Sequence, residues 1–208
     1  FFGAGNLIFP VHMGQLAGAN SYIAALGFIV TAVGLPLIGV AAFGISRSDD
    51  LLAMSSRVGK GYGVFFTCAL YLTIGPLFAI PRCAATSFTI GVEPMLTGGA
   101  VTELAIFSVI FFALVLFFSL RPSKILTWVG RIINPLFLVF LAVLVVTALV
   151  KPVAAVSSVS PEGAYASSAF SAGFLDGYNT MDALASLAFG VIVVGVIRDL
   201  GIKHDAAV

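Results

Sequence analysis

The stretch Phe2-Gly3-Ala4-Gly5-Asn6-Leu7-Ile8-Phe9-Pro10 interrupts an apolar segment that would otherwise form an unbroken helix. Glycine weakens a helix interior because it loses the most backbone entropy, and Asn6 competes for backbone hydrogen bonds. If the helix opens here, free N–H groups at its new start can hold an anion, and free C=O groups can hold a cation. A glycine-rich face packed against another helix is the alternative, and these residues alone leave both readings open.

A second stretch of this kind is Asn179-Thr180-Met181-Asp182-Ala183-Leu184-Ala185-Ser186-Leu187-Ala188-Phe189-Gly190. Asp182 falls near or within an apolar span, where an ionisable residue indicates a functional site. Ser186 and Gly190 mark the place where we expect this helix to open. The alternative is that Asp182 is an acid at a helix N-terminus at the external interface, where the helix dipole favours it.

The composition around these two stretches is that of a membrane protein. Of the 208 residues, 60% are hydrophobic and 9% are charged, and the mean hydropathy is +1.14. A soluble domain carries about 25% charged residues, so this chain has too few to cover a surface facing water. The formal charge of +1 comes without a concentrated basic patch, which argues against nucleic acid as a partner. The lipid bilayer is the expected environment.

A bilayer core of about 30 Å requires about 20 apolar residues in a helix. We therefore predict one transmembrane domain over residues 1–208, an all-α polytopic bundle. It has a partial span at 1–16, and its further spans lie near 21–45, 61–87, 104–120, 132–150 and 173–198. The chain starts at Phe1, already inside an apolar stretch, so we expect it to be the N-terminal half of a longer protein.

Basic residues collect in alternate connections between these spans. Eight of the ten are Arg47, Arg57, Lys60, Arg121, Lys124, Arg131, Arg198 and Lys203. The positive-inside rule places these connections, and the N-terminal side of the chain, in the cytoplasm. The segment from Lys151 to Ser171 is then an external loop.

The spacing of the two interrupted stretches predicts an inverted repeat. The first opens the chain, and the second lies five spans later. Because five is odd, the second unit enters the membrane from the opposite side. Transporters built from inverted repeats place their two discontinuous helices in corresponding positions, where they meet at the bilayer midplane.

Other residues carry weaker signals. Pro36 and the pair Gly75-Pro76 predict kinks in the second and third spans. Arg82 is an interfacial side chain or an external gate charge, and the Tyr71 hydroxyl needs a partner at membrane depth. His12 has no ligand nearby in the sequence, so we predict no transition-metal site. Cys68 and Cys83 both fall in one apolar stretch, and we expect them to be reduced and buried.

The chain resembles the bacterial branched-chain amino acid:cation symporter family over essentially its whole length. The residues that carry the resemblance are Gly3-Ala4-Gly5-Asn6, Ile8-Phe9-Pro10, Gly34-Leu35-Pro36, Gly75-Pro76-Leu77-Phe78-Ala79, Pro81-Arg82, Gly177-Tyr178 and Thr180-Met181-Asp182. The resemblance implies uptake of leucine, isoleucine and valine, coupled to Na⁺ or H⁺, across the bacterial inner membrane. It also implies a C-terminal half that holds the remaining helices.

A more distant resemblance is to the sodium-coupled leucine-transporter fold, whose first and sixth helices are discontinuous. It implies that the amides of Ala4 and Gly5 hold the substrate carboxylate, and that Phe189 packs on the substrate side chain. Ala188 departs from a glycine of that pattern, and Leu184 stands where that fold has a threonine sodium ligand. The expected substrate residues are Gly3, Ala4, Gly5, Tyr71, Ser186, Leu187, Ala188, Phe189 and Gly190. The expected cation residues are Phe2, Asn6, Thr180, Asp182 and Ser186.

This reading needs no covalent chemistry and no cofactor besides the coupling ion, so we expect a transporter and not an enzyme. A channel would need a continuous polar pore lining, whereas the spans contain isolated Ser and Thr. An intramembrane enzyme would need paired catalytic residues, and Asp182 is the single candidate at membrane depth. Another amino-acid symporter of the same fold is the nearest alternative.

Overall fold

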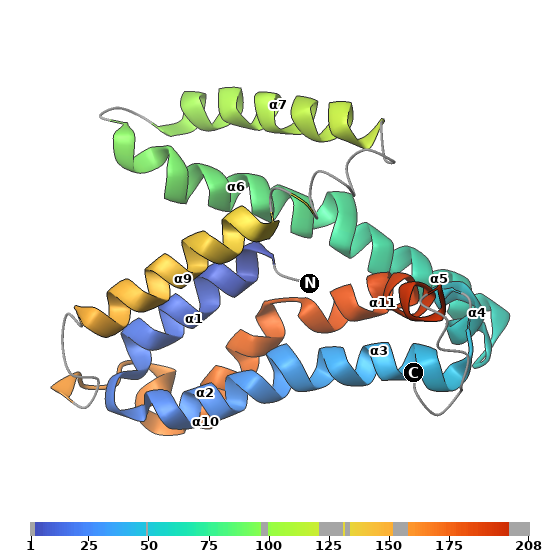
Figure 1. Cartoon of the computed structure of the whole chain (residues 1–208), viewed down its shortest axis with the longest axis horizontal. Helices are drawn as coiled ribbons and strands as arrows, with labels where there is room; N and C mark the ends of the chain where they lie inside the picture. The colour runs from blue at the N-terminus through green and yellow to red at the C-terminus, as the bar shows by residue number, and fades with distance from the viewer. Residues whose placement is uncertain are drawn as a thin grey trace. The chain divides into compact units, whose positions relative to one another are not determined.

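The computed structural model describes residues 3–48, 50–96, 100–120, 131, 134–151 and 158–199, and helices dominate them (Figure 1). These residues contain no strand, which confirms the predicted all-α class. The chain divides into two compact units. The first comprises residues 1–83 with 159–208, and the second comprises residues 84–158.

The first unit contains both interrupted stretches. Its elements are α1 (Ala4–Ala17), the turn η1 (Gly18–Asn20), α2 (Ser21–Ile29), the π-helical turn η2 (Val30–Gly34), α3 (Leu35–Ser46), α4 (Leu51–Ser56), α5 (Lys60–Leu72), the π-helical turn η3 (Thr73–Leu77), the part of α6 (Ala79–Gly91) up to Cys83, α10 (Ala164–Asn179) and α11 (Asp182–Asp199). The second unit holds the rest of α6, the turn η4 (Glu93–Met95), α7 (Ala100–Ser119) and α9 (Asn134–Val150).

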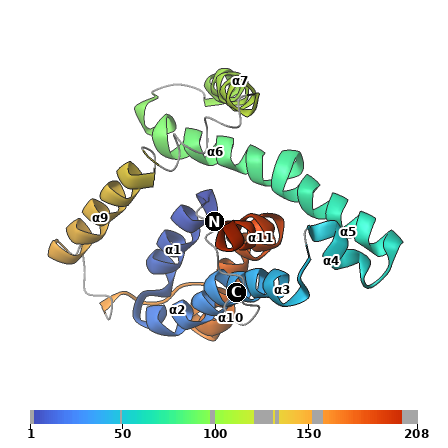
Figure 2. The ribbon, with the colours of Figure 1, turned by 45° about the vertical axis from the view of Figure 1, so that its right-hand side comes forward.

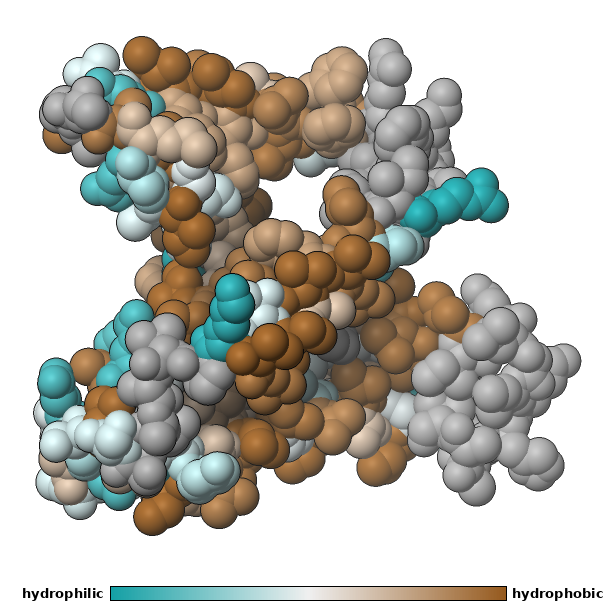
Figure 3. Space-filling model, turned by 60° about the vertical axis from the view of Figure 1, so that its left-hand side comes forward, coloured by the Kyte–Doolittle hydropathy of each residue, from teal (hydrophilic) through white to brown (hydrophobic). Residues whose placement is uncertain are grey.

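The described helices are suited to a membrane. The runs Ala4–Ser46, Lys60–Met95 and Val101–Ser119 are long and apolar enough to cross one, and the bent pair α10 and α11 is a fourth candidate. Helix α9 is apolar but shorter, at 17 residues. Apolar side chains cover most of the coloured surface in Figure 3, as expected where lipid replaces water. A multi-pass membrane protein is therefore confirmed.

One predicted kink occurs, and one predicted loop is too long. Gly75 inside η3 leaves helical geometry at φ −84° and ψ −117°, just before Pro76, which has no N–H to donate to the preceding turn. The kink predicted at Pro36 does not appear as a break in helical geometry, because Gly34 and Leu35 keep helical angles beside the π-helical turn η2. The external loop predicted to extend to Ser171 is wrong beyond residue 163, because α10 begins at Ala164. Tyr165 and Ala169 are buried there with Ala17 and Ala24, so tertiary packing supports a helix in a sequence rich in serine and alanine.

Helices α10 and α11 lie along α2 and α3, in the same direction (Figures 1 and 2). Glycines make this contact possible. A Cβ at Gly173 would overlap the Ala24 carbonyl oxygen, and one at Gly27 or Gly177 would overlap backbone oxygens of Phe170 or Phe28. Small residues let helix backbones approach closely in membranes, where packing and not water exclusion drives association.

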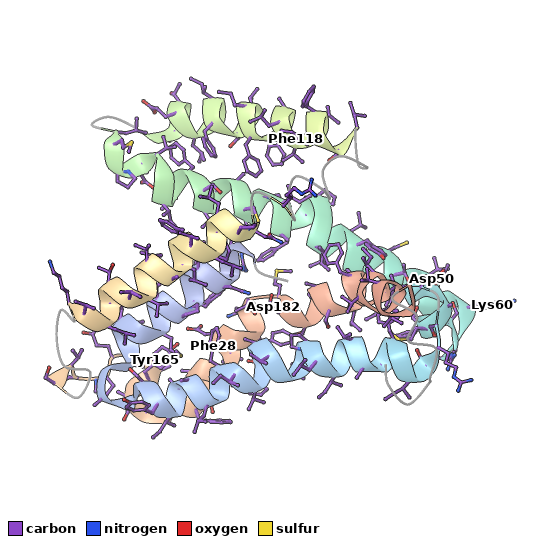
Figure 4. The ribbon with its side chains drawn as sticks, in the orientation of Figure 1. Phe28, Asp50, Lys60, Phe118, Tyr165 and Asp182 are labelled. Carbon is purple, nitrogen blue, oxygen red and sulfur yellow. The ribbon has the colours of Figure 1, made fainter. Side chains whose placement is uncertain are left out.

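The junction between α10 and α11 lies halfway along this bundle. The run from Ser21 to Ser46 is about 39 Å long at 1.5 Å per residue, and η2 at its centre packs against both α10 and α11. Figure 4 places Tyr165 near one end and Asp50 and Lys60 near the other, with Asp182 between them. The junction therefore lies part-way along the α2–α3 run, away from both of its ends.

The turn after α1 and the segment before α10 close one end of the bundle together. The Ala19 amide donates to the Val159 carbonyl at 2.9 Å, and the Glu162 amide donates to the Leu16 carbonyl at 2.8 Å. The Asn20 side chain also donates to the Tyr165 carbonyl at 3.0 Å. The predicted topology puts both segments on the same side of the membrane, in agreement with these bonds.

We predict that Gly173→Ala destabilises the full-length protein by about 1–3 kcal/mol, because the added methyl group must push α10 away from α2. Unfolding in detergent, followed by circular dichroism against added denaturant, measures the change. Gly61→Ala is the matched control, because a Cβ at Gly61 meets nothing within 4 Å. Equal stability of the two variants would contradict close packing at Gly173.

Candidate functional site

The chain leaves helical geometry between α10 and α11. Helix α10 ends at Asn179, α11 begins at Asp182, and the two axes are bent by 42°. Met181 has a φ of +67°, in the left-handed region that costs an ordinary residue about 1–2 kcal/mol. The break exposes the carbonyl end of α10 and the amide end of α11 to the same space.

The start of α1 is a second free helix end. Gly3 is extended, with φ −127° and ψ −178°, and the helix begins at Ala4. The Asn6 amide donates to the Gly3 carbonyl at 3.0 Å. In the first turn of a helix, the amides have no intrahelical acceptor, and Ala4 and Gly5 occupy this turn.

Gly5 brings these two helix ends together. A Cβ at this position would lie 2.8 Å from the Thr180 Cα and 2.9 Å from the Thr180 carbonyl oxygen, and it would overlap Nη2 of Arg82. Only glycine lets α1 approach the break this closely. The start of α1 and the α10–α11 break therefore face each other, while α1 itself is regular helix from Ala4 through Ala17 and shows no interruption there.

A cavity of about 470 Å³ lies where these elements meet. Helix ends and polar groups form one part of its lining, and apolar side chains form the other. Its lining residues are Gly3, Ala4, Gly5, Ile74, Ala79, Arg82, Cys83, Thr180, Met181, Asp182, Ala185, Phe189, Ile192 and Val193. A cavity of this size and mixed lining suits a small ligand that has charged and apolar ends.

The polar groups at this cavity are largely buried. Thr180 and Asp182 are each 6% exposed. The Thr180 hydroxyl donates to the Gly177 carbonyl at 2.7 Å and accepts from the Asp182 amide at 3.4 Å. Oδ1 of Asn6, in the first turn of α1, is buried without a partner among the described residues. These oxygens are ligands of the type that a small cation prefers.

The predicted opening at Ser186–Gly190 is wrong, because α11 is regular helix through this stretch. Because successive residues of a helix point in different directions, the residues of this stretch face different neighbours. Phe189 shares the cavity face with Asp182 and Ala185, which lie seven and four residues before it. Ser186 is fully buried, donates to the Ala183 carbonyl at 2.7 Å and packs against Gly39 of α3.

The remaining residues predicted for substrate lie away from the cavity. Gly190 packs against Phe43 of α3, and Leu187 and Ala188 belong to the apolar cluster around Phe43 and Leu70. Tyr71 is 47% exposed on α5 and is absent from the cavity lining. Phe2 lies outside the described residues. The cavity thus gathers Gly3, Ala4, Gly5, Thr180, Asp182 and Phe189 from the predicted set, whereas Asn6 is absent from its lining.

Sequence reasoning missed two features. It treated Arg82 as an interfacial or gate residue, whereas the side chain lines the cavity. It also predicted no carboxylate partner for His12. In the structure, Nδ1 of His12 lies 3.3 Å from Oδ2 of Asp176. The same oxygen accepts a hydrogen bond from the Tyr165 hydroxyl. Residues 12 and 176 are too far apart in the sequence for any local pattern to pair them.

Comparison with known proteins gives a consistent result over the whole chain. The family described as branched-chain amino acid transport protein matches residues 1–208. The branched-chain amino acid permease BrnQ of Lactobacillus delbrueckii subsp. lactis is 52% identical over 210 residues, which cover 100% of this chain and 47% of that protein. BrnQ of Bacillus subtilis (strain 168) is 48% identical, covering 97% of this chain and 46% of that protein.

The branched-chain amino acid transport system 3 carrier protein of Pseudomonas aeruginosa is 45% identical, covering 98% of this chain and 46% of that protein. The chain spans about half the length of the curated relatives it matches. No solved structure matches it. The names of these relatives describe transport proteins, in agreement with the prediction that the chain is not an enzyme. With a family match over residues 1–208 and several helices suited to a membrane, the chain belongs to the family of branched-chain amino acid transport proteins.

Proposed function

We propose that the full-length protein takes up branched-chain amino acids together with a cation, by alternating access to the cavity between α1 and the α10–α11 break. One observation carries this proposal: the amide ends of α1 and α11 and the carbonyl end of α10 converge on a single cavity at mid-bundle depth. Transporters use such helix ends to hold anionic and cationic groups at the membrane midplane. The substrate class rests on the names of the relatives.

The cavity suits an amino-acid zwitterion that has an apolar side chain. The amides of Ala4 and Gly5 face a carboxylate, while the Thr180 carbonyl and the Asp182 carboxylate face an ammonium group. Ile74, Phe189 and Ile192 supply an apolar wall. One methylene group more or less in such a wall changes binding by about 1–3 kcal/mol, so leucine, isoleucine and valine are all accepted.

The coupling ion binds beside this substrate. The unpartnered Oδ1 of Asn6, with oxygens of Thr180 and Asp182, offers ligands for Na⁺. If the ion is H⁺, the Asp182 carboxylate is its acceptor. Substrate and ion favour each other's binding because each stabilises the arrangement of α1 and the break that the other requires.

The full-length protein has a defined orientation in the membrane and a second half that completes the fold. The distribution of Lys and Arg supports a cytoplasmic N-terminal side, with the turn Gly18–Asn20 and the segment Val159–Tyr165 outside. The bacterial relatives support a location in the bacterial inner membrane. Helices α10 and α11 begin a second repeat of a leucine-transporter-like fold. The C-terminal half of the protein completes that repeat and the cavity wall.

The first prediction of this proposal is uptake of labelled leucine by the full-length protein in proteoliposomes. We expect saturable uptake that follows an inward Na⁺ gradient and is competed by isoleucine and valine. Protein-free liposomes under the same gradient are the control. Uptake that follows only a proton gradient would assign H⁺ as the coupling ion, and absence of leucine uptake under both gradients would contradict the proposal.

Removal of the Asn6 side chain tests the ion site. Asn6→Ala should raise the Na⁺ concentration for half-maximal leucine uptake roughly tenfold, because one buried ligand oxygen is worth about 1–2 kcal/mol. Asn20→Ala is the matched control, since it removes the same side chain at the end of the bundle. An unchanged Na⁺ dependence in Asn6→Ala would exclude Asn6 as a ligand.

Cys83 provides a test of where the substrate binds, independent of transport rates. This thiol lines the cavity, whereas Cys68 is exposed on α5 outside it. In a Cys68→Ala background, leucine should slow modification of Cys83 by a small methanethiosulfonate reagent at least severalfold. The reverse background, with Cys83→Ala and Cys68 retained, is the control. Equal protection of both thiols, or of neither, would argue against this cavity.

A further inference from the structure

Arg82 stands in the wall between two cavities. Besides the cavity already described, a second one of about 470 Å³ is lined by Phe9, Thr73, Phe78, Arg82, Tyr178, Asn179, Met181 and Leu184. Arg82 and Met181 are the residues common to both linings, and Arg82 is the single basic residue among those that the structure describes in either lining.

The guanidinium is held by contacts with three elements. Its Nη1 donates to the Asn179 carbonyl at the end of α10 at 2.9 Å. Its Cζ lies 5.3 Å from the ring centre of Phe9 in α1 and 5.8 Å from that of Phe78. Its Nη2 lies against Gly5, beside the free amides of the α1 start. The cation is thus fixed in place by a carbonyl and two aromatic faces.

This cation lacks an anionic partner. No carboxylate oxygen of the described residues lies within ion-pair distance of Arg82, and the Asp182 carboxylate acts on it only at longer range. A guanidinium has five N–H donors in a planar fork, and the bond to Asn179 uses one of them. A cation without an anionic partner is expensive inside an apolar helix bundle, so a guanidinium at this place indicates a role with an anion. A role limited to capping α10 explains the bond to Asn179 but not the position between two cavities.

We propose that Arg82 binds the α-carboxylate of the amino-acid substrate, a role that rests on the function proposed above. The fork of Arg82 and the amides of Ala4 and Gly5 together surround the carboxylate, and Asp182 faces the ammonium group from the other side of the cavity. Because Arg82 lines both cavities, the same guanidinium receives the carboxylate from either one. Arg82 thereby makes a free carboxylate a condition for binding.

Equilibrium binding of two ligands to the purified full-length protein tests this role. L-Leucine carries the carboxylate, and L-leucinamide has the same side chain and ammonium group without it. Arg82→Gln should weaken leucine binding roughly 10- to 100-fold, the effect of losing charge-assisted hydrogen bonds, and should leave leucinamide binding equal or stronger. Arg82→Lys keeps the charge but not the planar fork, so its loss of leucine affinity should be smaller. Lys60→Gln, which removes an exposed basic residue at the end of the bundle, should change neither affinity.

The ratio of the two affinities separates recognition from folding. A variant whose fold is merely disturbed loses both ligands in proportion, whereas loss of carboxylate recognition lowers the ratio. If Arg82→Gln does not fold, Arg82→Lys replaces it in the test. A fall in the ratio of leucine affinity to leucinamide affinity in Arg82→Lys, smaller than that expected for Arg82→Gln, supports the role of Arg82. If a folded variant binds leucine and leucinamide in an unchanged ratio of affinities, the role of Arg82 is overturned, while the proposed function stands. Failure of the unaltered protein to bind leucine would overturn the proposed function and this role with it.

Discussion

Peptide groups freed by a helix break inside an apolar bundle must find partners within the protein, and this constraint governs the first unit. At the α10–α11 break, the Thr180 side chain bonds the Gly177 carbonyl and the Asp182 amide, and Arg82 of α6 bonds the Asn179 carbonyl. The start of α1 lies against Thr180. Because partners come from three segments, the break holds those segments around one cavity.

Close backbone contact is the second condition, and glycine provides it where α1 and α2 meet the broken helix. Because Gly5 has no side chain, the backbone of Thr180 can lie against α1. Gly27, Gly173 and Gly177 likewise let α10 pack closely against α2. The break then falls beside the π-helical turn η2, at the centre of the α2–α3 run. The position of the break along the bundle is thus a consequence of helix packing, since the glycine contacts fix how α10 lies along α2.

Opposite charges across the cavity give this arrangement its chemical character. Asp182 and Arg82 both line it, and neither forms an ion pair with the other at close range. A zwitterion offers the complementary charges, and electrostatic attraction is stronger here than in water because the surroundings are apolar. Binding and release of such a ligand change the balance of charge at the contact between α1 and the break. That contact is therefore the element of the fold best placed to respond to substrate.

The sequence by itself determined the all-α membrane class, the kink at Gly75 and the break before Asp182, since hydropathy and helix-breaking residues act locally. Tertiary structure decided which residues share the cavity. Helical phase places Phe189 there and directs Ser186 and Gly190 toward α3, so the opening expected at those residues lies instead at Thr180 and Met181. Packing against Ala17 and Ala24 starts α10 at Ala164, and folding brings Asp176 to His12. These outcomes depend on which helix faces meet, which no local pattern of residues encodes.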